Sequence, residues 1–178
     1  NSIYSLLKAF SQVVFPLITF PYISRVLLAE NVGKVNFANS IISYVSLAAS
    51  LGITTYAVRE CSKIKDDKNK LENMVGQIIS FNMVTTFIAY IGLALALLAV
   101  KPLENYREMI IILSTTVLFT TLGADWLNTA MEDFKYITVR TFLFQLVSIA
   151  AMLLFVRKPE DYMRYAVITV IASSGASI

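Results

Sequence analysis

The sequence predicts an all-α fold, a polytopic bundle of transmembrane helices with five spans and part of a sixth. Of its 178 residues, 57% are hydrophobic and only 15% are charged, whereas a soluble domain carries about 25% charged residues. The mean hydropathy is +0.67. Several charge-free runs also reach the roughly 20 apolar residues that a helix needs to cross the hydrocarbon of a bilayer. These observations together indicate a membrane protein.

Each predicted span follows a run with few or no charged residues. The runs 35–58 and 73–100 contain none over 24 and 28 residues. Three other runs are each interrupted by a single charge, at Lys8, Asp125 and Arg140. Lys8 can lay its aliphatic stem along the helix and keep its ammonium near water. The predicted spans are residues 5–26, 36–58, 76–100, 109–131, 138–156 and 164–178, the last of them truncated.

Composition excludes several functional classes. The chain has no His and one Cys, which excludes a disulfide scaffold, a Cys/His zinc cluster and a His-dependent catalytic triad. It has no phosphate-binding or dinucleotide-binding glycine motif. The net charge of +3 is too small to describe a nucleic-acid surface. We therefore predict no enzyme chemistry, no cofactor, no metal site and no nucleic-acid partner.

The basic residues give a weak indication of orientation. The connection 59–72 holds five Lys or Arg residues in 14, and such clusters favour the cytoplasmic side. The N-terminus is accordingly predicted to be cytoplasmic. Because the sequence starts at Asn1 and stops within an apolar run, we expect it to be part of a longer protein.

Polar residues recur at helical spacing along three predicted spans, which indicates faces turned away from lipid. Close helix packing also favours small hydroxylated residues, so a dry interface remains the alternative to a hydrated cavity. We predict Ser43, Ser50 and Asn128 as cavity-lining candidates. The stripes comprise Asn36, Ser40, Ser43, Ser46, Ser50 and Thr54; Thr121, Asp125, Asn128 and Glu132; and Thr138, Thr141, Gln145 and Ser148.

Three charged residues are candidates for function. Asp125 lies inside a predicted span, where ionisable residues usually face an interior and pair with another group. It could act in proton or cation coupling, pair with an Arg, or lie at the membrane edge. Arg25 and Arg59 end the first two spans and could contact lipid headgroups or bind phosphate oxygens in a cavity. Pro16 and Pro21 are expected to kink or break the first helix.

Several segments resemble bacterial polysaccharide flippases, the Wzx-type O-antigen and capsule transporters of the multidrug/oligosaccharidyl-lipid/polysaccharide exporter superfamily. The similar segments are PLITFPYISRVL (16–27), VNFANSIISYVSLAASLGITTYAVRE (35–60), LGADWLNTAMEDFKYITVRTFLF (122–144) and VRKPEDYMRYA (156–166). The family often has Leu-Gly after the Arg, where this chain continues from Arg25 with Val26-Leu27-Leu28-Ala29. The turn between the first two spans is therefore where the chain departs from the family.

The resemblance implies the N-terminal half of a two-bundle transporter of about 12 to 14 helices. It further implies flipping of oligosaccharide repeat units, linked to an undecaprenyl pyrophosphate carrier, across the bacterial inner membrane by alternating access. Membrane lipids and a polysaccharide polymerase machinery are the other implied partners. By motif position, Arg25 and Arg59 are implied to contact the pyrophosphate. Asp125 is a weaker candidate for coupling or ion pairing.

Two other functions remain open at this point. A cation-coupled multidrug exporter of the same fold would need carboxylates in its cavity, and the spans offer only Asp125. A membrane subunit that scaffolds a polysaccharide assembly complex without transport would have polar faces that pack dry.

Overall fold

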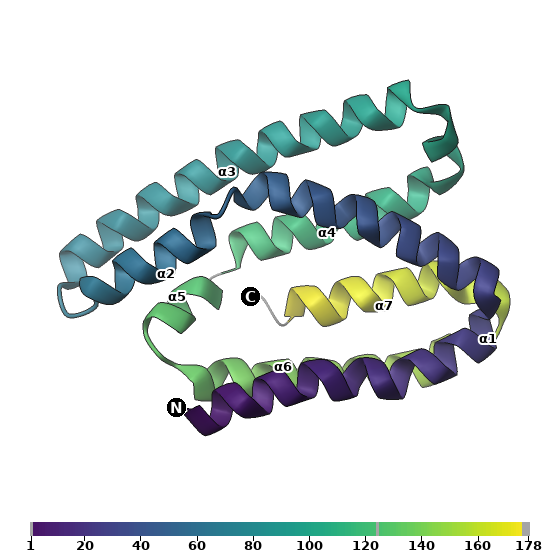
Figure 1. Cartoon of the computed structure of the whole chain (residues 1–178), viewed down its shortest axis with the longest axis horizontal. Coiled ribbons are helices and arrows are strands. Elements are labelled where there is room, and N and C mark those ends of the chain that lie inside the picture. The colour runs from purple at the N-terminus through teal and green to yellow at the C-terminus, as the bar shows by residue number, and fades with distance from the viewer. Residues whose placement is uncertain (1, 124, 176–178) are drawn as a thin grey trace.

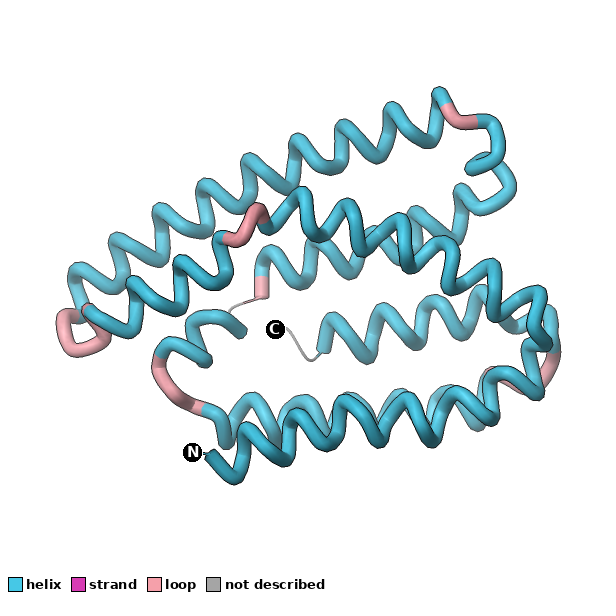
Figure 2. Tube along the Cα trace, viewed as in Figure 1, coloured by secondary structure: helices cyan, strands magenta, loops and turns pink. Residues whose placement is uncertain are grey.

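The computed structural model describes residues 2–123 and 125–175, and this part of the chain is almost entirely helical (Figures 1 and 2). Short connections join antiparallel neighbours, as expected for a helical bundle. The all-α prediction is confirmed. The helices are α1 (Ser2–Ser50), α2 (Ile53–Lys63), α3 (Lys68–Ala99), α4 (Arg107–Leu122), α5 (Asp125–Ala130), α6 (Phe134–Phe155) and α7 (Tyr162–Gly175), with 3-10 helices η1 (Lys101–Tyr106) and η2 (Pro159–Asp161).

α1 is two helices joined at a sharp bend, and it contains the first predicted span and most of the second. Its backbone leaves helical geometry at Leu28, where φ is 63° and ψ is 164°. Figure 1 shows its first half running away from the N-terminus and its second half returning along the bundle. Of the predicted kink or break at the prolines, the break does not occur, because Pro16 and Pro21 both lie within helical segments. The reversal occurs at Leu28, close to where the sequence departs from the family.

The second predicted span is also shorter than expected. α1 ends at Ser50, and Leu51 and Gly52 adopt positive φ values of 42° and 75° before α2 begins. Gly52 adopts this left-handed conformation without the steric cost that a Cβ would impose. Thr54 therefore lies on a different helix from the rest of its predicted stripe.

The helix predicted over 109–131 is likewise interrupted. α4 ends at Leu122, and α5 starts at Asp125, so Thr121 and Asp125 do not share one continuous helix face. The predicted 76–100 and 138–156 correspond closely to α3 and α6. α7 corresponds to the predicted sixth span, whose residues 176–178 lie outside the described residues.

Four helical stretches in the described chain are long and apolar enough to cross a membrane: Leu6–Ser50, Lys68–Ala99, Lys101–Ala130 and Phe134–Phe155. The first of these is folded back at Leu28. Each half of it has about 22 residues and spans about 33 Å at 1.5 Å per residue, which matches the hydrocarbon core. The two halves of this stretch therefore correspond to the first predicted span and most of the second.

The interior of the bundle is apolar, and much of the outside is apolar too. One buried cluster joins the second half of α1 with α3, α4 and α7, around Val35, Ile110 and Leu113. A second lies at the bend of α1, where Ile23 and Leu27 pack with Met152 of α6. Large apolar side chains are exposed along the outer faces of the helices. Exposed apolar surface of this extent indicates contact with lipid or with another protein segment.

Polar contacts fix the end of the bundle at which α1 bends. The Tyr22 hydroxyl donates to the carbonyl oxygen of Val156 at 2.9 Å, and the Asn31 side chain donates to the carbonyl oxygen of Pro159 at 2.8 Å. These bonds tie both halves of α1 to the connection between α6 and α7. The bend is therefore held by backbone carbonyl oxygens more than 120 residues away in sequence.

Candidate functional site

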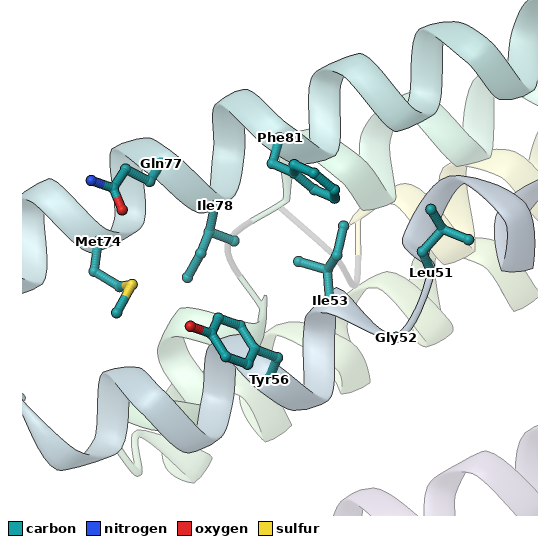
Figure 3. A pocket seen from close by; sticks show the side chains of 8 residues that line it. All are labelled: Leu51, Gly52, Ile53, Tyr56, Met74, Gln77, Ile78 and Phe81. Atoms are coloured by element: carbon teal, nitrogen blue, oxygen red, sulfur yellow. The ribbon is translucent and has the colours of Figure 1, made fainter.

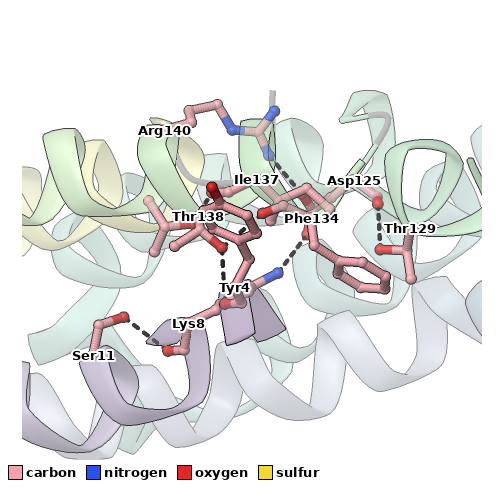
Figure 4. A network of polar contacts seen from close by, with 10 residues as sticks. Tyr4, Lys8, Ser11, Asp125, Thr129, Phe134, Ile137, Thr138 and Arg140 are labelled. Atoms are coloured by element: carbon pink, nitrogen blue, oxygen red, sulfur yellow. Dashed lines mark hydrogen bonds and ion pairs between the residues drawn. The ribbon is translucent and has the colours of Figure 1, made fainter. Parts of the chain in front are cut away.

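Three charged side chains from three different helices meet near the N-terminal end of the bundle (Figure 4). Nη2 of Arg140 donates to Oδ1 of Asp125 at 2.5 Å, and Nζ of Lys8 donates to Oδ2 of the same carboxylate at 3.3 Å. We call Lys8, Asp125 and Arg140 the charged cluster. It contains two cations and one carboxylate, so it carries one excess positive charge.

The interruption between α4 and α5 positions the carboxylate. α5 begins at Asp125, and the hydroxyl of Thr129 donates to the Asp125 carbonyl oxygen at 2.7 Å, one turn into this short helix. Asp133 starts the next helix by accepting from the backbone N–H of Tyr136. This turn lets α5 and α6 place Asp125 and Arg140 side by side although 15 positions separate them.

α1 reaches the charged cluster through its first turns. The hydroxyl of Thr138 donates to the backbone carbonyl oxygen of Tyr4 at 3.0 Å, which holds α6 against the start of α1. The guanidinium of Arg140 also lies over the ring of Tyr136, 5.1 Å from its centroid. A cation over an aromatic face is attracted by the negative face of the ring.

Burial differs among the three charged residues. The Arg140 side chain is only 8% exposed, while those of Asp125 and Lys8 are 33% and 25% exposed. Removing one partner of a buried ion pair leaves a charge in a low-dielectric environment. Arg140 is therefore the member of the charged cluster whose pairing matters most for stability, and Lys8 is the more accessible of the two cations.

Sequence reasoning identified Asp125 but did not assign it these partners. Lys8 and Arg140 were recognised only as single charges interrupting apolar runs. That interruption was the available signal, because an ionisable residue within a spanning helix generally has a partner in the bundle.

The structure does not bring Arg25 and Arg59 together. Arg25 is exposed and lies three residues before the bend at Leu28, whereas Arg59 lies in α2 at the opposite end of the bundle (Figure 1). The Arg59 side chain is 73% exposed, and its Nε donates to Glu60 at 3.0 Å. The ammonium of Lys63, and then the guanidinium of Arg59, hold the pKa of the Glu60 carboxyl below its usual value.

The three cavity-lining candidates lie on two elements, Ser43 and Ser50 in the second half of α1 and Asn128 in α5. Ser43 is exposed, and its hydroxyl donates to the Asn39 carbonyl oxygen within the same helix. The Ser50 hydroxyl donates in the same way to the carbonyl oxygen of Leu47. Asn128 is half-buried in α5. Elsewhere, Thr121 of its predicted stripe pairs with the buried hydroxyl of Thr86 at 2.9 Å, an arrangement typical of close helix packing.

The cavities of the bundle are open and mostly apolar. One of about 450 Å³ lies where α2 faces α3, between Tyr56 and Phe81, beside the break at Gly52 (Figure 3). A second, of about 570 Å³, lies between the second half of α1 and α3. A third, of about 160 Å³, lies between the first half of α1 and α6. Within residues 2–123 and 125–175, no group of three or more Cys, Asp or Glu residues could hold a metal ion.

Apolar helices of membrane-spanning length, with a charged cluster between them, define a multi-pass helical membrane protein. Comparison with known proteins gives the family. The chain matches the family described as "Polysaccharide biosynthesis protein" over residues 1–178, and it belongs to that family.

The chain is similar to a protein of Escherichia coli (strain K12) described as "Putative O-antigen transporter". The two are 26% identical over 161 residues, which cover 90% of this chain and 39% of the relative. The chain thus spans well under half the length of this relative. No solved structure matches it.

Proposed function

We propose that this chain is part of a transporter that flips oligosaccharide repeat units, linked to undecaprenyl pyrophosphate, across the bacterial inner membrane for surface polysaccharide synthesis. The observation that carries the proposal is the family match along the whole chain. The similar E. coli protein is described as "Putative O-antigen transporter", which supports an O-antigen or related polysaccharide as the cargo. The role is transport rather than catalysis.

The physical requirement for such a protein is a polar route for the headgroup. A sugar headgroup with its diphosphate has to cross about 30 Å of hydrocarbon, where unsatisfied polar groups are strongly unfavourable. Charged and hydroxylated side chains between helices replace water along the route, while the prenyl chain stays in lipid. Net outward movement of negative charge against the membrane potential requires roughly 2.3 kcal/mol per charge per 100 mV, so the cycle needs a driving force.

Arg25 and Arg59 are proposed to contact the diphosphate at opposite mouths of this route. Both side chains are exposed, and they belong to opposite ends of the bundle. A guanidinium stays charged and binds phosphate oxygens with two parallel hydrogen bonds. With the N-terminus in the cytoplasm, Arg59 serves the cytoplasmic mouth and Arg25 the outer mouth.

The charged cluster favours this function over export of cationic drugs. A drug exporter would use Asp125 as a carboxylate for cationic substrates, yet both carboxylate oxygens already contact cations. We therefore propose that Asp125 acts by pairing with Arg140, and that Ser43, Ser50 and Asn128 line the route in a conformation more open than this one.

The test uses the full-length protein in a strain that lacks its gene. Expression should restore surface polysaccharide and should clear lipid-linked oligosaccharide from the cytoplasmic leaflet. The drug-export alternative is tested in the same strains by uptake of a labelled cationic dye. Restored dye efflux without any change in surface polysaccharide would contradict the proposal.

A further inference from the structure

The groove between the first half of α1 and α6 continues directly from the charged cluster. Its apolar walls are Phe10, Phe15 and Ile18 on one side and Phe142, Leu146 and Ile149 on the other. Ser11 also lines it, and the Ser11 hydroxyl donates to the carbonyl oxygen of Lys8 at 2.8 Å. The backbone of Lys8 therefore lies about one helical turn from the groove, and its ammonium lies at Asp125.

The direction of the groove is that of a lipid chain entering a bilayer. The first half of α1 and α6 both run away from the N-terminal end of the bundle (Figure 1). The lining residues follow Lys8 and Arg140 in sequence on these helices, so the groove extends from the charged cluster towards the membrane centre. Lys8 and Ile18 are about 15 Å apart along a helix, which is half of the roughly 30 Å hydrocarbon core.

The charged cluster at the end of the groove nearest Lys8 is positive, which is the sign that attracts a lipid phosphate. Arg140 is nearly buried against Asp125, and Lys8 is the more accessible cation. One carboxylate contacts both cations, so the three residues of the charged cluster carry a formal excess of one positive charge. Basic pockets between membrane helices on the cytoplasmic side bind anionic lipid headgroups.

We propose that this groove binds an anionic phospholipid, with the phosphate at Lys8 and one acyl chain between α1 and α6 down to Ile18 and Ile149. The lipid would cover the apolar walls and neutralise the excess charge. This site is separate from Arg25 and Arg59, and it does not depend on which molecule is transported.

The experiment measures lipid retention by the full-length protein using native mass spectrometry, with phosphatidylglycerol and phosphatidylcholine as probes. Phosphatidylglycerol should be retained preferentially. Lys8→Gln should reduce that preference about fivefold, the value of one basic residue near a lipid surface. Lys135→Gln is the control, since Lys135 is exposed on α6 at the same end of the bundle but is not part of the charged cluster.

A second pair of variants tests the groove independently of charge. Leu146→Trp should fill the groove and lower retention of both lipids, whereas Leu143→Trp places the same bulk on the exposed face of α6 outside it. Equal retention of the two lipids, or retention unchanged in both Lys8→Gln and Leu146→Trp, would overturn the proposal. Displacement of phosphatidylglycerol by equimolar undecaprenyl phosphate would overturn it too, because the groove would then belong to the carrier.

Discussion

Asp125 and Arg140 form a 2.5 Å ion pair between α5 and α6, and the arginine side of this pair is almost completely buried. Lys8 of α1 binds the other carboxylate oxygen at 3.3 Å. One carboxylate thus links the first helix of the chain to two helices more than 100 positions later. Because Arg140 is closer to Asp125 and more deeply buried than Lys8, we expect Arg140 to contribute more than Lys8 to the stability of the bundle.

Arg140→Met should destabilise the bundle by about 3 kcal/mol, because it leaves the Asp125 carboxylate without its closest cation. Lys8→Gln should cost about 1 kcal/mol or less, as for a solvent-accessible pair. The measurement is the free energy of unfolding of the full-length protein in detergent. Equal losses for the two variants would show that the difference in burial has no energetic consequence.

Leu28→Gly should stabilise the bend of α1 by about 1 kcal/mol. Leu28 has a φ of 63° and a ψ of 164°, a region essentially restricted to Gly, in which other residues carry roughly 1–3 kcal/mol of strain. Its side chain is exposed, so little packing is lost. Leu47→Gly, at an exposed helical position in the same element, should instead destabilise by about 1 kcal/mol. Thermal unfolding of the two variants separates relief of strain from the general effect of Gly.

Gly175→Ala should destabilise the packing of α7 on α6 by about 1–3 kcal/mol, the usual effect of overpacking. A Cβ at this position would overlap the ring of Phe144, including its Cγ. Gly92→Ala is the matched control, because nothing lies within 4 Å of a Cβ there; it should be neutral or stabilising by up to about 1 kcal/mol. Adding Phe144→Leu to Gly175→Ala should recover part of the lost stability. If it recovers none, the overlap with Phe144 is not the cause of the destabilisation.

The η2 connection should lose stability in acid through Asp161. The backbone N–H of Arg157 is the main influence that holds the pKa of this carboxyl below its usual value, helped by the N–H of Lys158 and the charge of Arg164. A lowered folded-state pKa means that the contribution is present above the unfolded-state value. It disappears as the pH falls through the lower folded-state value. Asp161→Asn should therefore lower the free energy of unfolding at neutral pH and have little effect in strong acid.

Arg25→Ala and Arg59→Ala should each lower surface polysaccharide several-fold with no loss of protein from the membrane. Both side chains are exposed, so the variants remove a proposed phosphate contact without opening the core. Lys101→Ala provides an exposed basic control outside the proposed route. Full polymer output from both Arg variants would exclude their role.

The sequence located the apolar helices well but misplaced some of their ends. α3 and α6 follow the predicted spans 76–100 and 138–156 closely, because the cost of burying a charge in lipid acts along a single segment. The reversal at Leu28 and the breaks at Leu51 and after Leu122 interrupt runs that remain apolar. Hydropathy carries no information about backbone direction within such runs. The positive φ at Leu28 is adopted by a residue other than Gly, so the sequence contains no glycine that would indicate a turn at this position.

The sequence by itself determined that this chain is a membrane helix bundle with an ionisable residue at Asp125, because composition and charge spacing decide what a bilayer accepts. Only the tertiary structure decided that Asp125 meets Lys8 and Arg140. Helical periodicity relates residues along one helix, whereas these relationships depend on where the chain reverses. In this chain the reversal of α1 is held by hydrogen bonds from Tyr22 and Asn31 to backbone carbonyl oxygens of the distant connection between α6 and α7.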